Sequence, residues 1–344
     1  MTNIVVIGAG SWGGAIAAAL MRAKPQSDKT DQNLNSKQIN VLARRQESVD
    51  ALAGGRCLHL PDSPTAMPIA ATTNPDCLYG ADLVFVAVPV VANQASFLLI
   101  HDLQARKQSR EKNKKPATIV LCAKGICKAD DGRAMLLTEL AANVLPSHPV
   151  AVFSGPSFAD EVFGGLPAAL VAASHDPAIA IQVQEVFEGS NLRLYSNDDP
   201  VGVALGGAMK NVIAIAAGCA VGAGFGDNAK AAILTRGLAE IARFAHFMGA
   251  KPDTIYGLAG VGDLALTCAG PHSRNMAFGM ALGRGEAPPS RLAEGSRTVA
   301  QLAGLAKSRG IDLPITSAVD KLVNHDFDLH KVVADLLARR AGAE

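Results

Sequence analysis

A glycine pattern near the start constrains the fold of this chain more than any other feature. Residues 4–7 form a short apolar β-branched run, and Gly8, Gly10 and Gly13 follow it directly, at the opening of an alanine-rich helical segment. Such glycines allow a tight turn and let the backbone approach a pyrophosphate, which the free N–H groups of a helix N-terminus then bind. The pattern therefore predicts a dinucleotide-binding unit, with a ligand-free glycine turn as the alternative.

Short apolar runs alternate with helical patterns up to about residue 196, which is typical of a parallel sheet wrapped by helices. We expect strands at residues 4–7, 39–43, 83–88, 118–123, 150–153 and 169–173. Beyond Tyr195 the strand signals end, and Asp199 and Pro200 predict the cap and first residue of a helix. The sequence predicts an α/β fold, with an N-terminal Rossmann-like dinucleotide-binding sheet domain (residues 1–196) and an all-α substrate domain (residues 197–344).

Composition narrows the classes of partner. The chain has 344 residues, 49% of them hydrophobic, and a formal net charge of +1, which argues against a nucleic-acid binder that works through bulk charge. Its six cysteines are scattered without metal-ligand spacing, so we expect reduced thiols, no metal site and a cytoplasmic location. Two polar segments, 25–38 and 104–116, read as insertions, and we interpret the basic second one as a solvated loop rather than an RNA-binding segment.

One lysine stands alone in the apolar stretch from Pro200 to Gly226, where Lys210 is the only charged residue. Three readings compete: a membrane span with small-residue packing patterns, a lysine whose head reaches solvent, and a catalytic amine. A lysine inside a span costs about 2.5–3.5 kcal/mol, and no basic cluster flanks the stretch. Because burial favours the neutral amine, we favour Lys210 as a general acid or base and expect no membrane insertion.

The end of the second predicted strand bears on the choice of cofactor. An acidic residue usually stands there and binds the ribose 2′-hydroxyl of NAD, but this strand is followed by Arg44 and Arg45. A guanidinium pair suits a 2′-phosphate, although arginines are also commonly solvent-exposed. We therefore expect NADP(H) as cofactor, with NAD(H) as the alternative.

Polar residues that could bind a substrate follow other strands and helix starts. Lys124 follows the strand at 118–123, and the turn Ser154–Ser157 follows the strand at 150–153, so both belong at the carboxyl edge of the sheet. Asp263 and Ser273 stand at predicted helix starts, where capping alone could explain them. Arg274 opposes the dipole of the helix it begins, and a bound phosphate would resolve that conflict.

Eight sequence blocks occur together in one order: G-A-G-S-W-G (8–13), A-V-P (87–89), A-K-G (123–125), S-G-P-S-F-A (154–159), A-M-K-N (208–211), D-N-A-K-A-A (227–232), G-V-G-D-L (260–264) and S-R-N (273–275). With them the chain resembles the bacterial NAD(P)-dependent glycerol-3-phosphate dehydrogenases along essentially its whole length. The resemblance implies reversible reduction of dihydroxyacetone phosphate to sn-glycerol 3-phosphate, feeding glycerophospholipid synthesis. It also implies a small phosphorylated substrate and is compatible with a homodimer.

The resemblance also implies roles for individual residues. It matches Lys210 to the proton-transfer lysine and Lys124 to a lysine shared by cofactor and substrate. The implied substrate contacts are Lys124, Gly155, Ser157, Lys210, Asp263, Ser273, Arg274 and Asn275. The implied cofactor contacts, including the glycine turn, are Gly8, Gly10, Ser11, Trp12, Gly13, Arg44, Arg45, Lys124, Ala159, Arg274, Leu292 and Glu294.

Four departures from the family pattern remove no chemical group that the reaction needs. Gly14 stands where threonine is common, Met209 where leucine is usual, Met276 where arginine is frequent and Leu292 where valine is usual. The nearest alternative function is a related hydroxyacid or phosphogluconate-type dehydrogenase, which pairs similar domains and also uses a lysine. A non-enzymatic NADPH sensor is a remote alternative, because sensing needs neither Lys124 nor Lys210.

Overall fold

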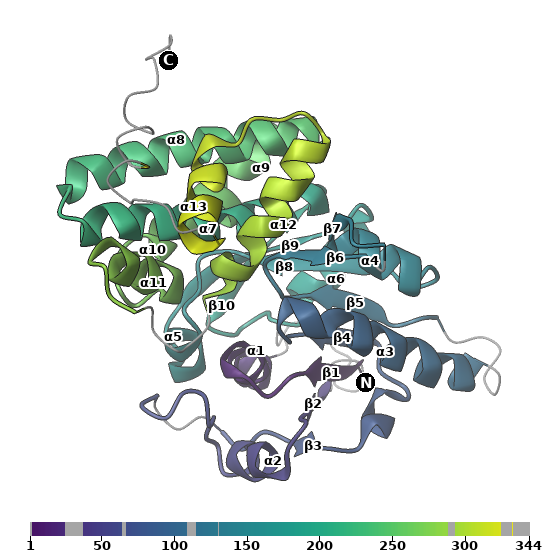
Figure 1. Ribbon diagram of the computed structural model, residues 1–344. Coiled ribbons are helices and arrows are strands. Elements are labelled where there is room, and N and C mark those ends of the chain that lie inside the picture. Colours follow the sequence, from purple (N-terminus) through teal and green to yellow (C-terminus); the bar gives the residue numbers. More distant parts are fainter. Residues whose placement is uncertain are drawn as a thin grey trace. The chain divides into compact units, whose positions relative to one another are not determined.

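The computed structural model describes seven parts of the chain (Figure 1): residues 2–24, 37–63, 67–108, 115–129, 131–287, 293–324 and 332. Residues 25–36 and 109–114 of the two polar segments, and Leu292, lie outside the described residues. Residues 104–108, which were expected in a loop, are the end of a helix. The chain forms two compact units: Met1–Ala123 with Leu137–Pro200, and Lys124–Leu136 with Val201–Glu344. The sequence predicts a boundary at residue 196, with residues 124–136 in the first domain, whereas the structure groups that segment with the helices.

The first unit is built on an eight-stranded sheet. Its strand order is β10-β9-β8-β5-β4-β1-β2-β3. The strands are β1 (Thr2–Ile7), β2 (Lys37–Leu42), β3 (Ala71–Thr72), β4 (Leu83–Val86), β5 (Thr118–Leu121), β8 (Val150–Ser154), β9 (Ala168–Ala173) and β10 (Leu192–Asn197). All six predicted strands are present. Two were missed: the two-residue β3, and β10, whose buried Leu192 and Leu194 alternate with exposed Arg193 and Tyr195.

The sheet is parallel except at one pair, where the expectation of a parallel strand was wrong. β9 runs antiparallel to β8, with Val152 opposite Ala173, and β10 runs parallel to β9. The connection from β8 to β9 contains one helix, α5 (Ala159–Gly164). Six helical residues rise about 9 Å, less than the roughly 17 Å length of a five-residue strand. The helix alone thus does not span the length of β8, and the chain enters β9 antiparallel to β8.

Helices cover this sheet, and aromatic rings fill its core (Figure 1). The helices are α1 (Ser11–Arg22), α2 (Gln46–Ala53), α3 (Asn93–Gln108), α4 (Leu137–Val144), α5 and α6 (Pro177–Glu185), with short 3-10 turns at Pro75–Leu78 and Val90–Ala92. Phe153 lies at the centre of an aromatic cluster, 6.1 Å from Trp12, 6.0 Å from Phe85 and 5.5 Å from Phe187 between ring centroids. This cluster links the start of α1 to the middle of the sheet.

The second unit is helical, with one small hairpin. Its elements are β6 (Ile126–Lys128), β7 (Ala134–Leu136), α7 (Pro200–Gly222), α8 (Gly226–Phe247), α9 (Pro252–Tyr256), a π-helical turn (Leu258–Gly262), α10 (Asp263–Thr267), α11 (Arg274–Gly283), α12 (Glu294–Ser308) and α13 (Pro314–Asn324). Among the described residues, α7 is the one helix long and apolar enough to cross a membrane, and 94% of that apolar window is buried inside the protein. That degree of burial is typical of a core helix.

The small-residue pattern on α7 has a packing role within this unit. Gly218 and Gly222 face α11, where an added Cβ would overlap the carbonyl oxygens of Met276 and Met280. Reciprocally, Gly279 of α11 packs on the backbone of α7. The glycines let the two helix backbones come into contact, which fixes the start of α11 relative to α7.

Candidate active site

The site in the helical unit is built around a carboxylate that binds two lysines. Lys210 Nζ donates to Asp263 Oδ1 at 2.5 Å, and Lys124 Nζ donates to Asp263 Oδ2 at 2.8 Å. The Asp263 side chain is 1% exposed, and those of Lys210 and Lys124 are 9% and 15% exposed. The buried Lys210 amine excludes the reading in which its head reaches solvent.

Thr267 completes the environment of the Lys210 amine and was missed from the sequence. Its hydroxyl accepts a hydrogen bond from Lys210 Nζ at 2.8 Å and donates one to the Asp263 carbonyl at 2.6 Å. Thr267 and Asp263 lie four residues apart on α10, so they share one helix face. That spacing was the available signal, but a threonine four residues after an aspartate is too common to stand out.

The surroundings of Lys210 lower its pKa. Burial is the largest cause, and together with the charge of Lys124 it outweighs the opposing effects of Asp263 and Glu294, bringing the pKa from 10.5 to about 8. Desolvation disfavours the ammonium form, whereas a nearby carboxylate favours it. The amine can therefore give up and regain a proton near neutral pH, as a general acid or base requires.

Glycines place Asp263 against α7. The glycine-rich segment Leu258–Gly262 forms one π-helical turn that leads directly into α10. A Cβ at Gly260 would overlap the Ile255 carbonyl oxygen, and one at Gly206 of α7 would come within 2.7 Å of the Ala259 carbonyl oxygen. Close backbone packing thus holds the segment before Asp263 against α7 at Gly206, one helical turn before Lys210.

The start of α11 carries the predicted phosphate-binding residues. Ser273 Oγ accepts from the Met276 N–H at 3.3 Å, so Ser273 is the helix cap, and Arg274 is exposed as the first helical residue. Asn275 is buried and its side chain is used within the protein. Its Nδ2 donates to Asn211 Oδ1 at 2.9 Å, which links α11 to the residue that follows Lys210.

In the sheet unit, the glycine pattern forms the predicted turn between β1 and α1. Gly8 has φ +111°, and a Cβ there would lie 2.5 Å from the Ala87 carbonyl oxygen, while a Cβ at Gly13 would overlap the carbonyl oxygen of Gly8. Ser11 Oγ donates to the His59 carbonyl at 3.3 Å. The first turn of α1 therefore has the close, side-chain-free backbone that suits a pyrophosphate.

One departure from the family pattern is explained by a neighbouring thiol. A Cβ at Gly14 would lie 3.1 Å from Cys57 Sγ, and that Sγ donates to the Gly10 carbonyl at 3.8 Å. Cys57 occupies the space that a larger side chain at position 14 would need.

The remaining predicted contacts of the sheet unit lie at its loops. Arg44 and Arg45 are exposed between β2 and α2, with Arg45 at the cap of α2. Gly155 has φ +144° and packs on Leu170, and Ser157 Oγ donates to the Gly155 carbonyl at 3.1 Å. Ala159 begins α5. In the helical unit Glu294 begins α12, whereas Leu292 lies outside the described residues.

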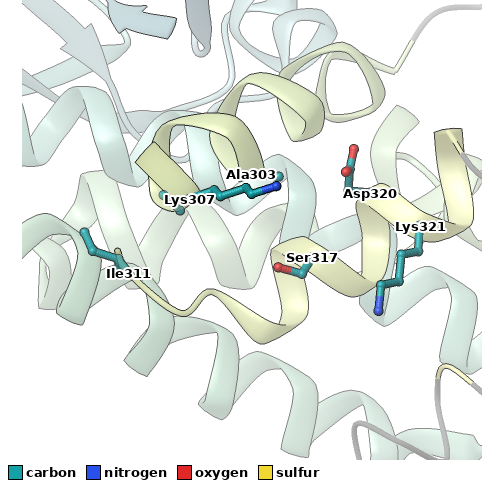
Figure 2. A pocket seen from close by; sticks show the side chains of 7 residues that line it. Ala303, Lys307, Ile311, Ser317, Asp320 and Lys321 are labelled. Atoms are coloured by element: carbon teal, nitrogen blue, oxygen red, sulfur yellow. The ribbon is translucent and has the colours of Figure 1, made fainter. Parts of the chain in front are cut away.

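A hollow of about 520 Å³ lies elsewhere in the helical unit (Figure 2), lined by Ala303, Ala306, Lys307, Ile311, Ser317, Asp320 and Lys321. Its walls come from α12, α13 and the segment between them. The lining contains none of the predicted site residues, so the hollow is separate from the lysine cluster.

Comparison with known proteins identifies the family. Residues 3–180 match the family model described as NAD-dependent glycerol-3-phosphate dehydrogenase N-terminus, and residues 199–334 match the model of its C-terminus. The chain belongs to this family. The match extends through both units, so the Rossmann-like sheet domain and the helical domain expected from the sequence are confirmed.

Individual proteins that are similar to this chain carry the same family name. The chain is 40% identical over 340 residues to the glycerol-3-phosphate dehydrogenase [NAD(P)+] of Mesorhizobium japonicum, covering 98% of this chain and 92% of the relative. It is 39% identical to the protein of the same name from Agrobacterium fabrum, covering 98% and 97% of the two chains. A crystal structure of glycerol-3-phosphate dehydrogenase from Coxiella burnetii superposes with a TM-score of 0.84 at 33% identity, covering 98% and 99%.

Proposed function

We propose that this chain reduces dihydroxyacetone phosphate to sn-glycerol 3-phosphate, reversibly, with NADP(H) as the preferred cofactor and NAD(H) as a weaker one. The observation that carries this proposal is the buried Lys210–Asp263–Lys124 cluster in a chain of the glycerol-3-phosphate dehydrogenase family. The cluster offers an amine that can exchange a proton near neutral pH, together with a second cation.

In this mechanism the C2 carbonyl carbon of the substrate would receive a hydride from the reduced nicotinamide when the cofactor is bound. Lys210 donates its proton to the C2 oxygen, which would otherwise become an alkoxide. Lys124 stabilises the negative charge that develops on that oxygen. Asp263 and Thr267 hold the Lys210 amine in place, so that its free N–H is directed by two fixed hydrogen bonds.

The substrate phosphate is proposed to bind at the start of α11. Arg274 supplies a guanidinium there, and the N-terminus of a helix supplies backbone N–H groups and a partial positive charge. A bound phosphate removes the unfavourable position of a cation at this helix end. We also propose substrate contacts for Gly155 and Ser157 of the sheet unit.

The cofactor is proposed to bind the sheet unit through the turn at Gly8–Gly13, whose backbone leaves room for a pyrophosphate. The 2′-phosphate is assigned to Arg44 and Arg45, which stand at the N-terminus of α2. Ser11, Trp12, Ala159 and, in the helical unit, Glu294 are further proposed contacts.

Three finer points also belong to this proposal. The product is the backbone of glycerophospholipids, which supports a role in their synthesis. A cytoplasmic location fits six cysteines that are free thiols. A homodimer is proposed from the family resemblance and is testable by sedimentation of the purified protein.

Replacement of the proposed acid tests the function. Lys210→Ala should lower kcat about 10²–10⁴-fold with little change in NADPH affinity, because the side chain acts in proton transfer. The affinity can be measured by fluorescence of Trp12, the single tryptophan. Lys307→Ala, at an exposed lysine of the same unit, is the matched control. Near-normal turnover of Lys210→Ala would overturn the assignment.

Substrate choice separates this function from its nearest alternative. Dihydroxyacetone phosphate should be reduced, whereas 6-phosphogluconate and ketopantoate, which carry carboxylates, should not be turned over. If the chain binds the cofactor but turns over none of these substrates, the result would instead indicate a non-enzymatic sensor.

A further inference from the structure

Asn275 makes two buried hydrogen bonds that join three helices. Its Nδ2 donates to Asn211 Oδ1 on α7 at 2.9 Å, and its Oδ1 accepts from the Gly295 N–H on α12 at 2.9 Å. Asn275 itself is only 8% exposed. Its carbonyl oxygen and one of its two amide hydrogens are thus bound to protein atoms, which leaves one N–H for any ligand.

The start of α12 is held at a second point by close packing. A Cβ at Gly295 would lie 2.7 Å from the carbonyl oxygen of Asn211 and 2.9 Å from Ile215 Cδ1. A side chain at position 295 would push the start of α12 away from α7. The start of α12 is therefore fixed in two ways. The N–H of Gly295 is bound by Asn275, and the Cα of Gly295 packs directly on α7.

We propose that Asn275 is a positioning residue, which holds the start of α12, and Glu294 with it, against α7 beside Lys210. Glu294 precedes Gly295 in the chain, and Asn211 follows Lys210. Asn275 thus connects Gly295, the neighbour of the Glu294 carboxylate, with Asn211, the neighbour of the Lys210 amine. The proposal rests on the proposed role of Lys210 as proton donor.

The charges around Lys210 determine how the position of Glu294 affects the pKa of the amine. The charged and titratable groups whose fields reach Lys210 or the adjacent Cys268 are Asp263, Lys124, Glu294, Lys230 and Cys268 itself. Burial and Lys124 lower the pKa of Lys210, whereas Asp263 and Glu294 raise it. Asp263 is fixed by hydrogen bonds to both lysines, so the start of α12 is the element whose displacement changes this balance.

Releasing the start of α12 should therefore favour the neutral amine. A carboxylate that moves away by one or two ångströms loses part of its interaction with the ammonium, equivalent to about 0.5 pH unit at the effective dielectric of a partly buried site. The alkaline limb of the pH profile of kcat for reduction should shift down by that amount, with NADPH and dihydroxyacetone phosphate both saturating.

The test compares four variants of the full chain: Asn275→Ala, Gly295→Ala, Glu294→Gln and the double variant Asn275→Ala/Glu294→Gln. The first two should each lower the apparent pKa of kcat by about 0.5 unit, and Glu294→Gln by at least as much. Glu294→Gln already removes the negative charge that Asn275 positions. In the double variant, Asn275→Ala should therefore lower the apparent pKa of kcat hardly further than Glu294→Gln alone does.

Two other outcomes would count against the proposal. If Asn275→Ala raises KM for dihydroxyacetone phosphate and leaves the pH profile unchanged, Asn275 acts as a phosphate ligand alone. Equal shifts with and without Glu294 would show that Asn275 acts by another route. If Asn275→Ala does not fold, Gly295→Ala gives the decisive profile. Failure of the proposed function is recognised separately, because the unaltered chain would then not reduce dihydroxyacetone phosphate, and failure of the role of Lys210 because Lys210→Ala would keep its turnover.

Discussion

The two oxygens of Asp263 are shared between Lys210 and Lys124, at 2.5 and 2.8 Å. One buried carboxylate thus faces two ammonium groups. When Lys210 loses its proton, the Lys124–Asp263 ion pair remains, so the charge of Lys124 keeps its partner. The arrangement lets Lys210 change its charge while its neighbours keep theirs.

The first prediction concerns pH. Because the pKa of Lys210 is lowered to about 8, kcat for reduction should be constant below that pH and fall above it, as the acid form is lost. Oxidation of sn-glycerol 3-phosphate needs the neutral amine, so its kcat should rise through the same range. Steady-state rates in both directions, with all substrates saturating, provide the measurement. Parallel profiles in the two directions would contradict the role of Lys210.

The second prediction concerns Thr267. Thr267→Val keeps the shape of the side chain but removes the oxygen that accepts from Lys210, which should lower kcat about tenfold, the equivalent of one hydrogen bond to a charged group. The alkaline limb should also move to lower pH, because the ammonium form loses an acceptor. Thr267→Ser retains the hydroxyl and serves as the control. A serine variant as slow as the valine variant would argue for packing instead.

The fold class and the central lysine could be predicted because each depends on local sequence. The glycines at 8, 10 and 13 act through their own backbone, and Lys210 is the single charge in its helix. The direction of β9 could not be predicted in the same way, since it depends on how the chain between β8 and β9 packs on the sheet. The assignment of residues 124–136 to the helical unit depends on contacts with distant segments.

The site contacts that could not be predicted join residues far apart in the sequence. Asp263 was selected at a helix start, but its hydrogen bond to Lys124 joins residues 139 apart in the chain. Asn211 and Thr267 are ordinary helical residues whose importance appears only when α7, α10 and α11 are packed together. The sequence shows which side chains are unusual, whereas packing decides which ordinary ones become their partners.

The third prediction concerns the cofactor. Arg44→Ala and Arg45→Ala should each raise KM for NADPH about 10–100-fold and leave KM for NADH nearly unchanged, because only NADPH carries the 2′-phosphate. Parallel assays with the two cofactors and saturating dihydroxyacetone phosphate measure the effect. Arg193→Ala is the matched control, since Arg193 is exposed on β10 at the opposite edge of the sheet. Equal losses with both cofactors would overturn the assignment of these arginines.

The fourth prediction concerns a buried carboxylate that caps α13. Glu240 on α8 is 1% exposed, and its Oε2 accepts from the Ile315 N–H at 2.8 Å. Its Oε1 accepts from the N–H and the hydroxyl of Thr316, at 2.9 and 2.7 Å. Burial raises the pKa of Glu240 despite these hydrogen bonds. The carboxylate thus provides acceptors for backbone groups that α13 cannot satisfy itself.

Glu240→Gln replaces one acceptor oxygen with a donor, which leaves an N–H at the start of α13 without a partner and should destabilise the protein by about 1–3 kcal/mol. Urea unfolding measures the change, and kcat of the folded variant should stay normal. The raised pKa of Glu240 also determines how the free energy of unfolding depends on pH. The stability due to this group is complete below its unfolded pKa and is lost as pH rises through the folded value. The glutamine variant should lack this dependence. Glu286→Gln, at an exposed glutamate paired with Arg284, should leave unfolding unchanged. Equal destabilisation by both variants would show that the capping of α13 is not the cause.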